Sequence, residues 1–223
     1  MSIRHALGKY LEDCRTFPAD AALAYRNEGW RGVWQALAPR TVDRAFRTAR
    51  MEVFAQSLDS APEVPPPPGV RIALLGDADW PALSGLITQR DMVRFRTLIA
   101  AGRHCLVAWR GAQPIGYGWV AGSIGPDVTA CDLRLPAHAA YLWDLYVLPS
   151  ERSSGVGSAL ASARIRIARE LGFVEGWRMI APSNTASLRT LARTGQNTRL
   201  VGELRYVKLL SRVHSRFTPA SRD

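Results

Sequence analysis

An apolar run, a glycine turn and the start of a helical pattern follow one another between residues 141 and 160. The turn reads Arg152-x-x-Gly155-x-Gly157. Glycines lack the Cβ atoms that would keep a phosphate away from the backbone, and a helix that begins there directs its unpaired N–H groups at the anion. Arg152 adds a cationic fork at the rim. The pattern predicts a phosphate-binding turn.

Two common nucleotide-binding loops fit this turn poorly. The ATP-binding loop requires a lysine after its second glycine, and this chain has no lysine between Lys9 and Lys208. The dinucleotide fingerprint requires a third glycine where Leu160 stands and an acid at the end of the next strand, whereas Glu175 precedes the next apolar run. A glycine turn that only reverses the chain is the remaining alternative.

The flanking residues narrow the choice. Leu145-Tyr146-Val147-x-Pro149 closes the apolar run, and Asn184-x-x-Ser187 opens a second helical pattern that ends near Gly195. Together with the turn, these motifs resemble the GCN5-related N-acetyltransferase (GNAT) superfamily over residues 69–210. The resemblance implies an acyl-coenzyme A ligand, with acetyl-coenzyme A as the expected cosubstrate and an unidentified amine as the acceptor.

The same resemblance implies how the donor is held. The strand before the turn splays from its neighbour, and its backbone bonds the pantetheine arm and polarises the thioester oxygen. The turn surrounds the pyrophosphate, while Asn184 and Ser187 contact the coenzyme from the later helix. The expected coenzyme-binding residues are Leu145, Tyr146, Val147, Arg152, Ser153, Ser154, Gly155, Val156, Gly157, Ser158, Asn184 and Ser187.

Acyl transfer to an amine requires a base for the amine and an acid for the leaving thiol. Asp144 is the expected base, because strict alternation along the strand places it on one face with Leu142 and Tyr146. The alternative is an acid that pairs with an arginine or faces solvent. Leu191 stands where many family members carry a tyrosine acid, so Tyr146 or water is expected to protonate the thiol. This departure also favours a second function, a non-catalytic sensor of acyl-coenzyme A.

Composition limits the other function classes. The chain has 223 residues and a net charge of +10. Residues 151–223 hold 13 basic and 5 acidic residues, a local excess that suits a phosphate-bearing cofactor. No aromatic platform interleaves with the basic residues, so no nucleic-acid partner is expected. Three unrelated cysteines predict neither disulfides nor a metal site, and with no apolar run of spanning length they favour a cytoplasmic protein.

The proline run 65–68 divides the sequence. Residues 1–60 are predicted to form a helical extension, with helices capped by Ser2, Asp20 and Thr41. Residues 61–68 are an extended linker, 69–210 the GNAT-like domain and 211–223 a basic tail. The aromatic residues Trp30 and Trp34 are expected to pack on the second domain or on a second copy of the chain, so a homodimer is one candidate assembly. Contact of residues 1–60 with a membrane surface is not expected.

After the prolines, the patterning alternates between strands and helices. Strands are predicted at 70–75, 104–109, 114–121, 141–148, 177–180 and 200–210, and helices at 80–87, 92–101, 155–171 and 184–193. Residues 122–138 form a long loop, of a length typical of lids. The fold class is therefore α+β, with a mostly antiparallel sheet whose central strands splay, flanked by helices.

Overall fold

The computed structural model describes residues 3–38, 46–59, 61–124, 133–195, 197–209 and 212–220. The proposed caps Ser2 and Thr41 lie outside these ranges, as does the middle of the loop 122–138. The helices are α1 (Ile3–Leu37), α3 (Trp80–Leu83), α4 (Gln89–Ala100), α5 (Val156–Glu170) and α6 (Thr185–Thr194), with short 3-10 turns at Asp77–Asp79 and Pro149–Glu151. The strands are β1 (Phe46–Ser57), β2 (Val70–Leu74), β3 (His104–Arg110), β4 (Gln113–Ala121), β5 (Ala139–Val147), β6 (Glu175–Ile180), β7 (Arg199–Leu209) and β8 (Arg212–Pro219).

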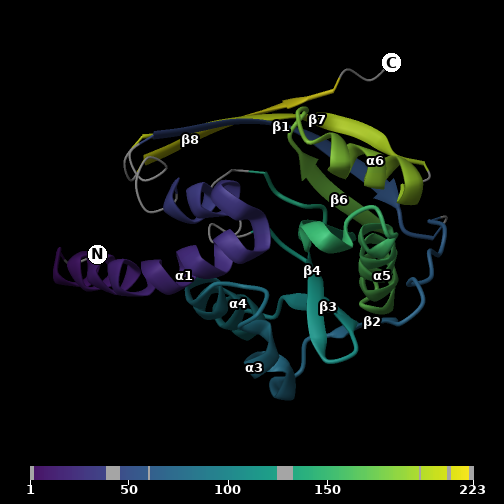
Figure 1. Ribbon diagram of the computed structural model, residues 1–223. Coiled ribbons are helices and arrows are strands. Elements are labelled where there is room, and N and C mark those ends of the chain that lie inside the picture. The colour runs from purple at the N-terminus through teal and green to yellow at the C-terminus, as the bar shows by residue number, and fades with distance from the viewer. Residues whose placement is uncertain are drawn as a thin grey trace.

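One mixed sheet organises the molecule. Its strand order is β2-β3-β4-β5-β6-β1-β7-β8, and every pair is antiparallel except β5 with β6. Helices α1, α3 and α4 lie on one side of the sheet, and α5 and α6 lie on the other (Figure 1). Because both faces are covered, β5 is buried without interruption from Ala139 to Trp143. The predicted α+β architecture is confirmed.

The two parallel strands separate after a short contact. β5 and β6 pair only from Ala139 opposite Glu175 to Tyr141 opposite Trp177. β5 then continues to Val147 with β4 as its partner, while β6 continues to Ile180 beside β1. This divergence is the splay that the family resemblance implied. It leaves one edge of β5 open next to the N-terminus of α5.

The N-terminal region differs from its prediction at two places. Phe46–Ser57 is strand β1 and not a third helix, because its residues pair with β6 on one side and with β7 on the other. Asp20 is not a helix cap, since α1 runs through it and breaks only at Gly29, where φ is 63°. The buried Asp20 carboxylate instead accepts a hydrogen bond of 2.8 Å from the Gln89 backbone N–H, which joins α1 to the first turn of α4.

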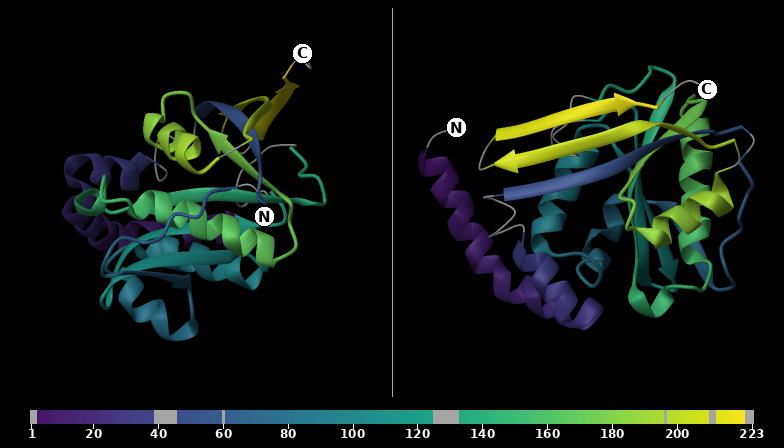
Figure 2. Two further views of the ribbon diagram at one scale, coloured as in Figure 1. Left: turned by 90° about the vertical axis from the view of Figure 1, so that its right-hand side faces the viewer. Right: turned by 90° about the horizontal axis from the view of Figure 1, so that it is seen from above.

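The two tryptophans of α1 do not pack on the second domain, one of the two expected partners. Trp30 is 77% exposed and Trp34 is 60% exposed, although Tyr25 makes an edge contact with the Trp30 ring. Burial of these side chains by a second copy of the chain stays a prediction. The break at Gly29 turns the end of α1 away from its first segment, which is visible as the bent purple helix in Figure 2.

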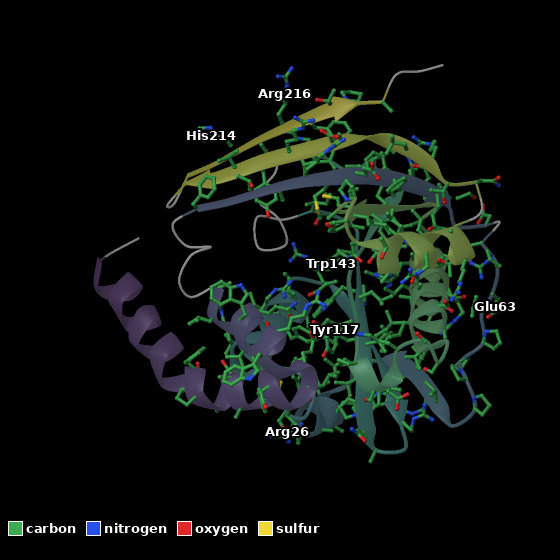
Figure 3. All side chains as sticks on the ribbon, turned by 45° about the horizontal axis from the view of Figure 1, so that its top comes forward. Arg26, Glu63, Tyr117, Trp143, His214 and Arg216 are labelled. Atoms are coloured by element: carbon green, nitrogen blue, oxygen red, sulfur yellow. The ribbon has the colours of Figure 1, made fainter. Side chains whose placement is uncertain are left out.

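The proline segment and the C-terminal tail also carry structure. Ser162 of α5 accepts a hydrogen bond of 2.9 Å from the Val64 N–H and donates one of 3.4 Å to the Pro62 carbonyl, so the segment lies along α5. Residues 212–219 form β8, the outer strand of the sheet, from which His214 and Arg216 point outward (Figure 3). The sheet therefore extends beyond the predicted boundaries 69–210 at both ends, through β1 and β8.

Candidate acyl-coenzyme A site

The turn between β5 and α5 has the backbone of an anion site. Ser153 (φ 64°) and Gly155 (φ 94°) both adopt left-handed conformations, and Gly155 is the N-cap of α5. No side chain caps this 15-residue helix, so its first N–H groups are left for a ligand. The Ser154 hydroxyl is not free to cap the helix, because it donates to the Glu151 carbonyl at 2.6 Å.

The two glycines serve different needs. At Gly155 the left-handed φ itself disfavours any side chain, and an added Cβ would lie 3.4 Å from Pro67. At Gly157 the nearest atom to an added Cβ would be a Val147 methyl group at 3.8 Å, which is ordinary contact. Packing therefore does not require a glycine at 157. Access of a ligand to the helix N-terminus is a reason for one.

The other predicted turn residues divide by burial. Ser153 and Ser154 are exposed and Ser158 is half-buried, so their polar atoms lie near solvent. Val156 is fully buried in the core, which leaves only its backbone for a ligand.

Arg152 is held against the end of β5. Its Nε donates to the Val147 carbonyl at 3.1 Å, and its guanidinium carbon lies 6.0 Å from the centre of the Tyr146 ring. Its Nη2 lies 3.1 Å from Oε1 of Glu28 on α1. The side chain thus connects the turn, the strand and the N-terminal helix.

A β-bulge interrupts β5 at the predicted catalytic position. Trp143 pairs with Trp119 and Tyr146 pairs with Tyr117, so Asp144 and Leu145 together lie opposite Gly118. Asp144 adopts φ 48°, which is uncommon for a residue other than glycine. The predicted strict alternation through Asp144 is therefore wrong. A bulge also leaves backbone groups unpaired, here on the strand that the resemblance assigns to the thioester.

Asp144 lies on the α4 side of the sheet. Its Oδ2 is 3.2 Å from Nη1 of Arg94. Burial raises the pKa of Asp144 above its ordinary value, and the charges of Arg94 and Arg164 act in the opposite direction. The structure therefore shows the alternative, in which Asp144 pairs with an arginine. The role of Asp144 as the catalytic base stays a prediction.

Tyr146 faces a pocket between the sheet and α1. Its ring stacks on Tyr117 with 5.5 Å between centres, and Figure 3 shows Tyr117 in the interior next to α1. The pocket has a volume of about 170 Å³ and is lined by Tyr117, Tyr146, residues of α1 including Glu28, and the start of α4. Burial raises the pKa of Tyr146, and the negative charge of the nearby Glu28 raises it further. The phenol therefore stays protonated at neutral pH.

Asn184 and Ser187 begin α6. The Asn184 side-chain oxygen accepts from the Ser187 N–H at 3.1 Å, so Asn184 is the N-cap of this helix. Both residues lie on the side of the sheet that carries α5. Leu191 is 5% exposed and belongs to the buried face of α6. A packing role accounts for a leucine at this position.

Two buried arginines were missed by sequence reasoning, which treats arginine as a surface residue. Arg164 of α5 crosses over Gly118, where an added Cβ would lie 2.8 Å from its Cδ, and donates to the Trp143 carbonyl at 3.0 Å. Arg178 of β6 reaches Thr194 of α6 at 3.4 Å, and its Nε and Nη2 have no hydrogen-bond partner among the described residues. Burial lowers the pKa of both guanidinium groups. The one sequence signal was the glycine at 118.

The sheet order, the splay and the turn at α5 define an acyltransferase-like α+β fold. The chain matches the model of the acetyltransferase (GNAT) family over residues 73–195, and it belongs to this family.

Solved structures share the fold at low identity. A Drosophila protein is 19% identical with a TM-score of 0.54, over 80% of this chain and 57% of its own. A GCN5-related glucosamine N-acetyltransferase region of a fungal multi-domain β-N-acetylglucosaminidase is 10% identical with a TM-score of 0.51, over 78% and 22%. A GNAT-family putative acetyltransferase from Novosphingobium aromaticivorans is 14% identical with a TM-score of 0.50, over 72% and 63%. This chain therefore spans 57% of the length of the Drosophila protein and 22% of the length of the fungal protein. A search of curated proteins finds no match.

Within the described residues, no helix is both long and apolar enough to cross a membrane. In the same part of the chain, no group of three or more His, Cys, Asp or Glu side chains is arranged to hold a metal ion.

Proposed function

We propose that the chain transfers an acetyl group from acetyl-coenzyme A to a primary amine, by direct attack in a ternary complex. The observation that carries this proposal is the uncapped N-terminus of α5 beside the open edge of β5. The N-terminus of a helix binds a phosphate through its unpaired backbone N–H groups and the positive end of its dipole. The pyrophosphate of the coenzyme would lie there, at residues 152–158.

From the pyrophosphate, the pantetheine arm would extend along β5. After residue 141, β5 no longer pairs with β6. The carbonyls of Trp143 and Val147 accept from Arg164 and Arg152, and the other backbone groups of this segment would bond an extended ligand as a neighbouring strand does. The bulge at Asp144 and Leu145 would place backbone N–H groups near the thioester, where they stabilise the charge that develops on its oxygen. Arg164 holds the Trp143 carbonyl and so fixes the geometry of this segment.

The chemical step requires a neutral amine on the opposite side of the thioester. The amine nitrogen attacks the carbonyl carbon, the C–N bond forms and the C–S bond breaks. One amine proton leaves to a base, and the coenzyme thiolate takes up a proton. We propose that the Tyr146 phenol supplies the proton to the thiolate, because Tyr146 lines the pocket beside β5 and belongs to the strand along which the pantetheine arm would lie. Asp144 is proposed as the base or as the group that fixes the bulge.

The second candidate is a non-catalytic sensor of acyl-coenzyme A. It is favoured by the pairing of Asp144 with Arg94, which occupies the expected base, and by the burial of Leu191. Coenzyme binding is common to both functions, whereas release of the coenzyme thiol is not.

The experiment has two stages. Calorimetric titration with acetyl-coenzyme A tests binding, and thiol release with a panel of amines tests catalysis. Binding without thiol release for any amine would support the sensor and contradict the enzyme. Asp144→Asn then separates the two roles of this residue: a variant that keeps coenzyme binding and full turnover excludes Asp144 as the base.

A further inference from the structure

The pocket beside Tyr146 differs in charge from the rest of the molecule. Two of its lining residues are the acids Glu28 and Asp91, and among the residues that the structure describes no lysine, arginine or histidine lines it. The whole chain has 29 basic and 19 acidic residues, so an acidic pocket is not what its composition would provide by chance. Asn27 and Gln35 add amide groups to the lining. The lining offers acceptors for hydrogen bonds from a cation.

Asp91 is available for such a cation. It lies in the first turn of α4 and accepts a hydrogen bond of 2.7 Å from the Thr88 hydroxyl. Within the described part of the chain no cationic side chain forms a salt bridge with it. An ionised carboxylate has about four acceptor positions, so Thr88 leaves most of them unused. The bond from Thr88 also fixes the direction of the carboxylate.

Glu28 brings a second carboxylate from a different element. Its side chain is 11% exposed, and it accepts from Arg152 through Oε1 at 3.1 Å. Tyr146, the residue next to the proposed thioester position, lines the same pocket. The contact between Asp20 and Gln89 joins α1 to α4 and so fixes Glu28 relative to Asp91.

The aromatic wall fits the same kind of ligand. Tyr117 and Tyr146 stack with an angle of 27° between their ring planes, and both line the pocket. The face of a tyrosine ring attracts an ammonium group. The volume of about 170 Å³ is below the range of roughly 300–1,000 Å³ that is usual for drug-sized ligands. The pocket is therefore suited to a small amine.

We infer that this pocket is the acceptor site and that it selects a small cationic amine without a carboxylate or phosphate group, with Glu28 of α1 and Asp91 of α4 as its anionic contacts. The inference rests on the acyltransferase function proposed above. An anionic group on the acceptor would lie beside two carboxylates in a partly buried site, where like charges repel strongly. The N-terminal helix is thereby assigned to specificity, since it supplies one of the two acids.

The test uses probe pairs that differ only by a carboxylate. Binding of 1,5-diaminopentane is compared with that of lysine, and agmatine with arginine, by calorimetry on the full chain with and without saturating coenzyme A. The amine without the carboxylate is expected to bind at least about tenfold more tightly in each pair, which corresponds to about 1.4 kcal/mol. Equal or tighter binding of the amino acids, or no binding of any probe, would overturn the inference.

Variants connect the preference to the two acids. Glu28→Gln and Asp91→Asn keep the side-chain size but remove the negative charge and turn one acceptor into a donor, and each is expected to reduce diamine affinity about tenfold. Glu170→Gln is the matched control, because this exposed acid of α5 pairs only with Arg166 in the described residues and changes the net charge equally. Unchanged affinity in both pocket variants would contradict the assignment. Coenzyme binding, measured on the same samples, reports separately on the proposed function.

Discussion

Oε1 of Glu28 lies 3.1 Å from Nη2 of Arg152, and this contact joins the N-terminal helix to the turn between β5 and α5 across 124 residues of sequence. Arg152 also holds the end of β5 through the Val147 carbonyl. A single guanidinium therefore contacts the element that would bind the donor and the element that would bind the acceptor.

Replacing Arg152 tests that connection. Arg152→Leu removes the cation at the rim of the turn and both of its anchoring bonds. We expect affinity for acetyl-coenzyme A to fall about tenfold, as for loss of one charge-assisted contact, and hydrogen exchange in residues 20–37 to become faster. Arg166→Leu on the exposed face of α5 is the control. Equal coenzyme affinity in the two variants would show that Arg152 does not serve the coenzyme.

The two glycines of the turn should separate stability from binding. Gly155→Ala forces an alanine to φ 94° and should lower the free energy of unfolding by about 1 kcal/mol. Gly157→Ala adds only a contact of 3.8 Å to Val147, so stability should be unchanged or rise by up to about 1 kcal/mol. Urea denaturation measures both changes.

Coenzyme titration then reports on position 157. If backbone N–H groups near Gly157 bind the pyrophosphate, Gly157→Ala should weaken acetyl-coenzyme A at least tenfold while the protein stays folded. A stable Gly157→Ala protein with full affinity would place the phosphate elsewhere.

Asp144 should give stability an unusual pH dependence. Its pKa is raised in the folded protein, chiefly by burial, so its charged form is a cost to folding that is present at neutral pH. The cost is lost as the pH falls through the folded-state pKa, because the carboxyl becomes neutral. Wild type should therefore gain stability relative to Asp144→Asn between pH 7 and about pH 4. Urea denaturation at several pH values measures this difference. A difference between wild type and Asp144→Asn that does not change with pH would contradict a raised pKa of Asp144.

Glu151 should show the opposite dependence. Its carboxylate accepts from Nε and Nη2 of Arg110 at 2.9 and 2.7 Å, and the hydrogen bond to Arg110 lowers its pKa. The stabilisation it contributes is present at neutral pH and is lost as the pH falls through the lowered pKa. Glu151→Gln should thus be slightly less stable than wild type at pH 7 and equal to it near pH 3, since the pair is at the surface. If Glu151→Gln were further below wild type in stability near pH 3 than at pH 7, a stabilising pair between Glu151 and Arg110 would be contradicted.

Local patterning was sufficient to predict the domain from β2 to α6. Apolar runs such as 104–109 and 114–121 are strands with a short connection, and the glycine turn sits between β5 and α5 as expected. These elements are formed by neighbours in sequence, so their signals are local. The position of Asn184 at the start of α6 follows from its capping chemistry for the same reason.

The features that sequence reasoning missed depend on distant partners. Residues 46–57 carry a spacing compatible with a helix, and only the edges of β6 and β7 make them a strand. The bulge at Asp144 is set by the register with β4, which periodicity along one strand cannot show. Glu28 lies at the candidate site because α1 reaches the turn between β5 and α5, where Glu28 contacts Arg152. No local sequence motif predicts a contact between residues so far apart in the chain.

Titration of the full chain with acetyl-coenzyme A shows whether the turn at the start of α5 binds the coenzyme. We expect one coenzyme per chain and an affinity that Gly157→Ala reduces at least tenfold, with Glu170→Gln as an unaffected control. Absence of binding at millimolar acetyl-coenzyme A, or binding that Gly157→Ala leaves unchanged, would contradict it.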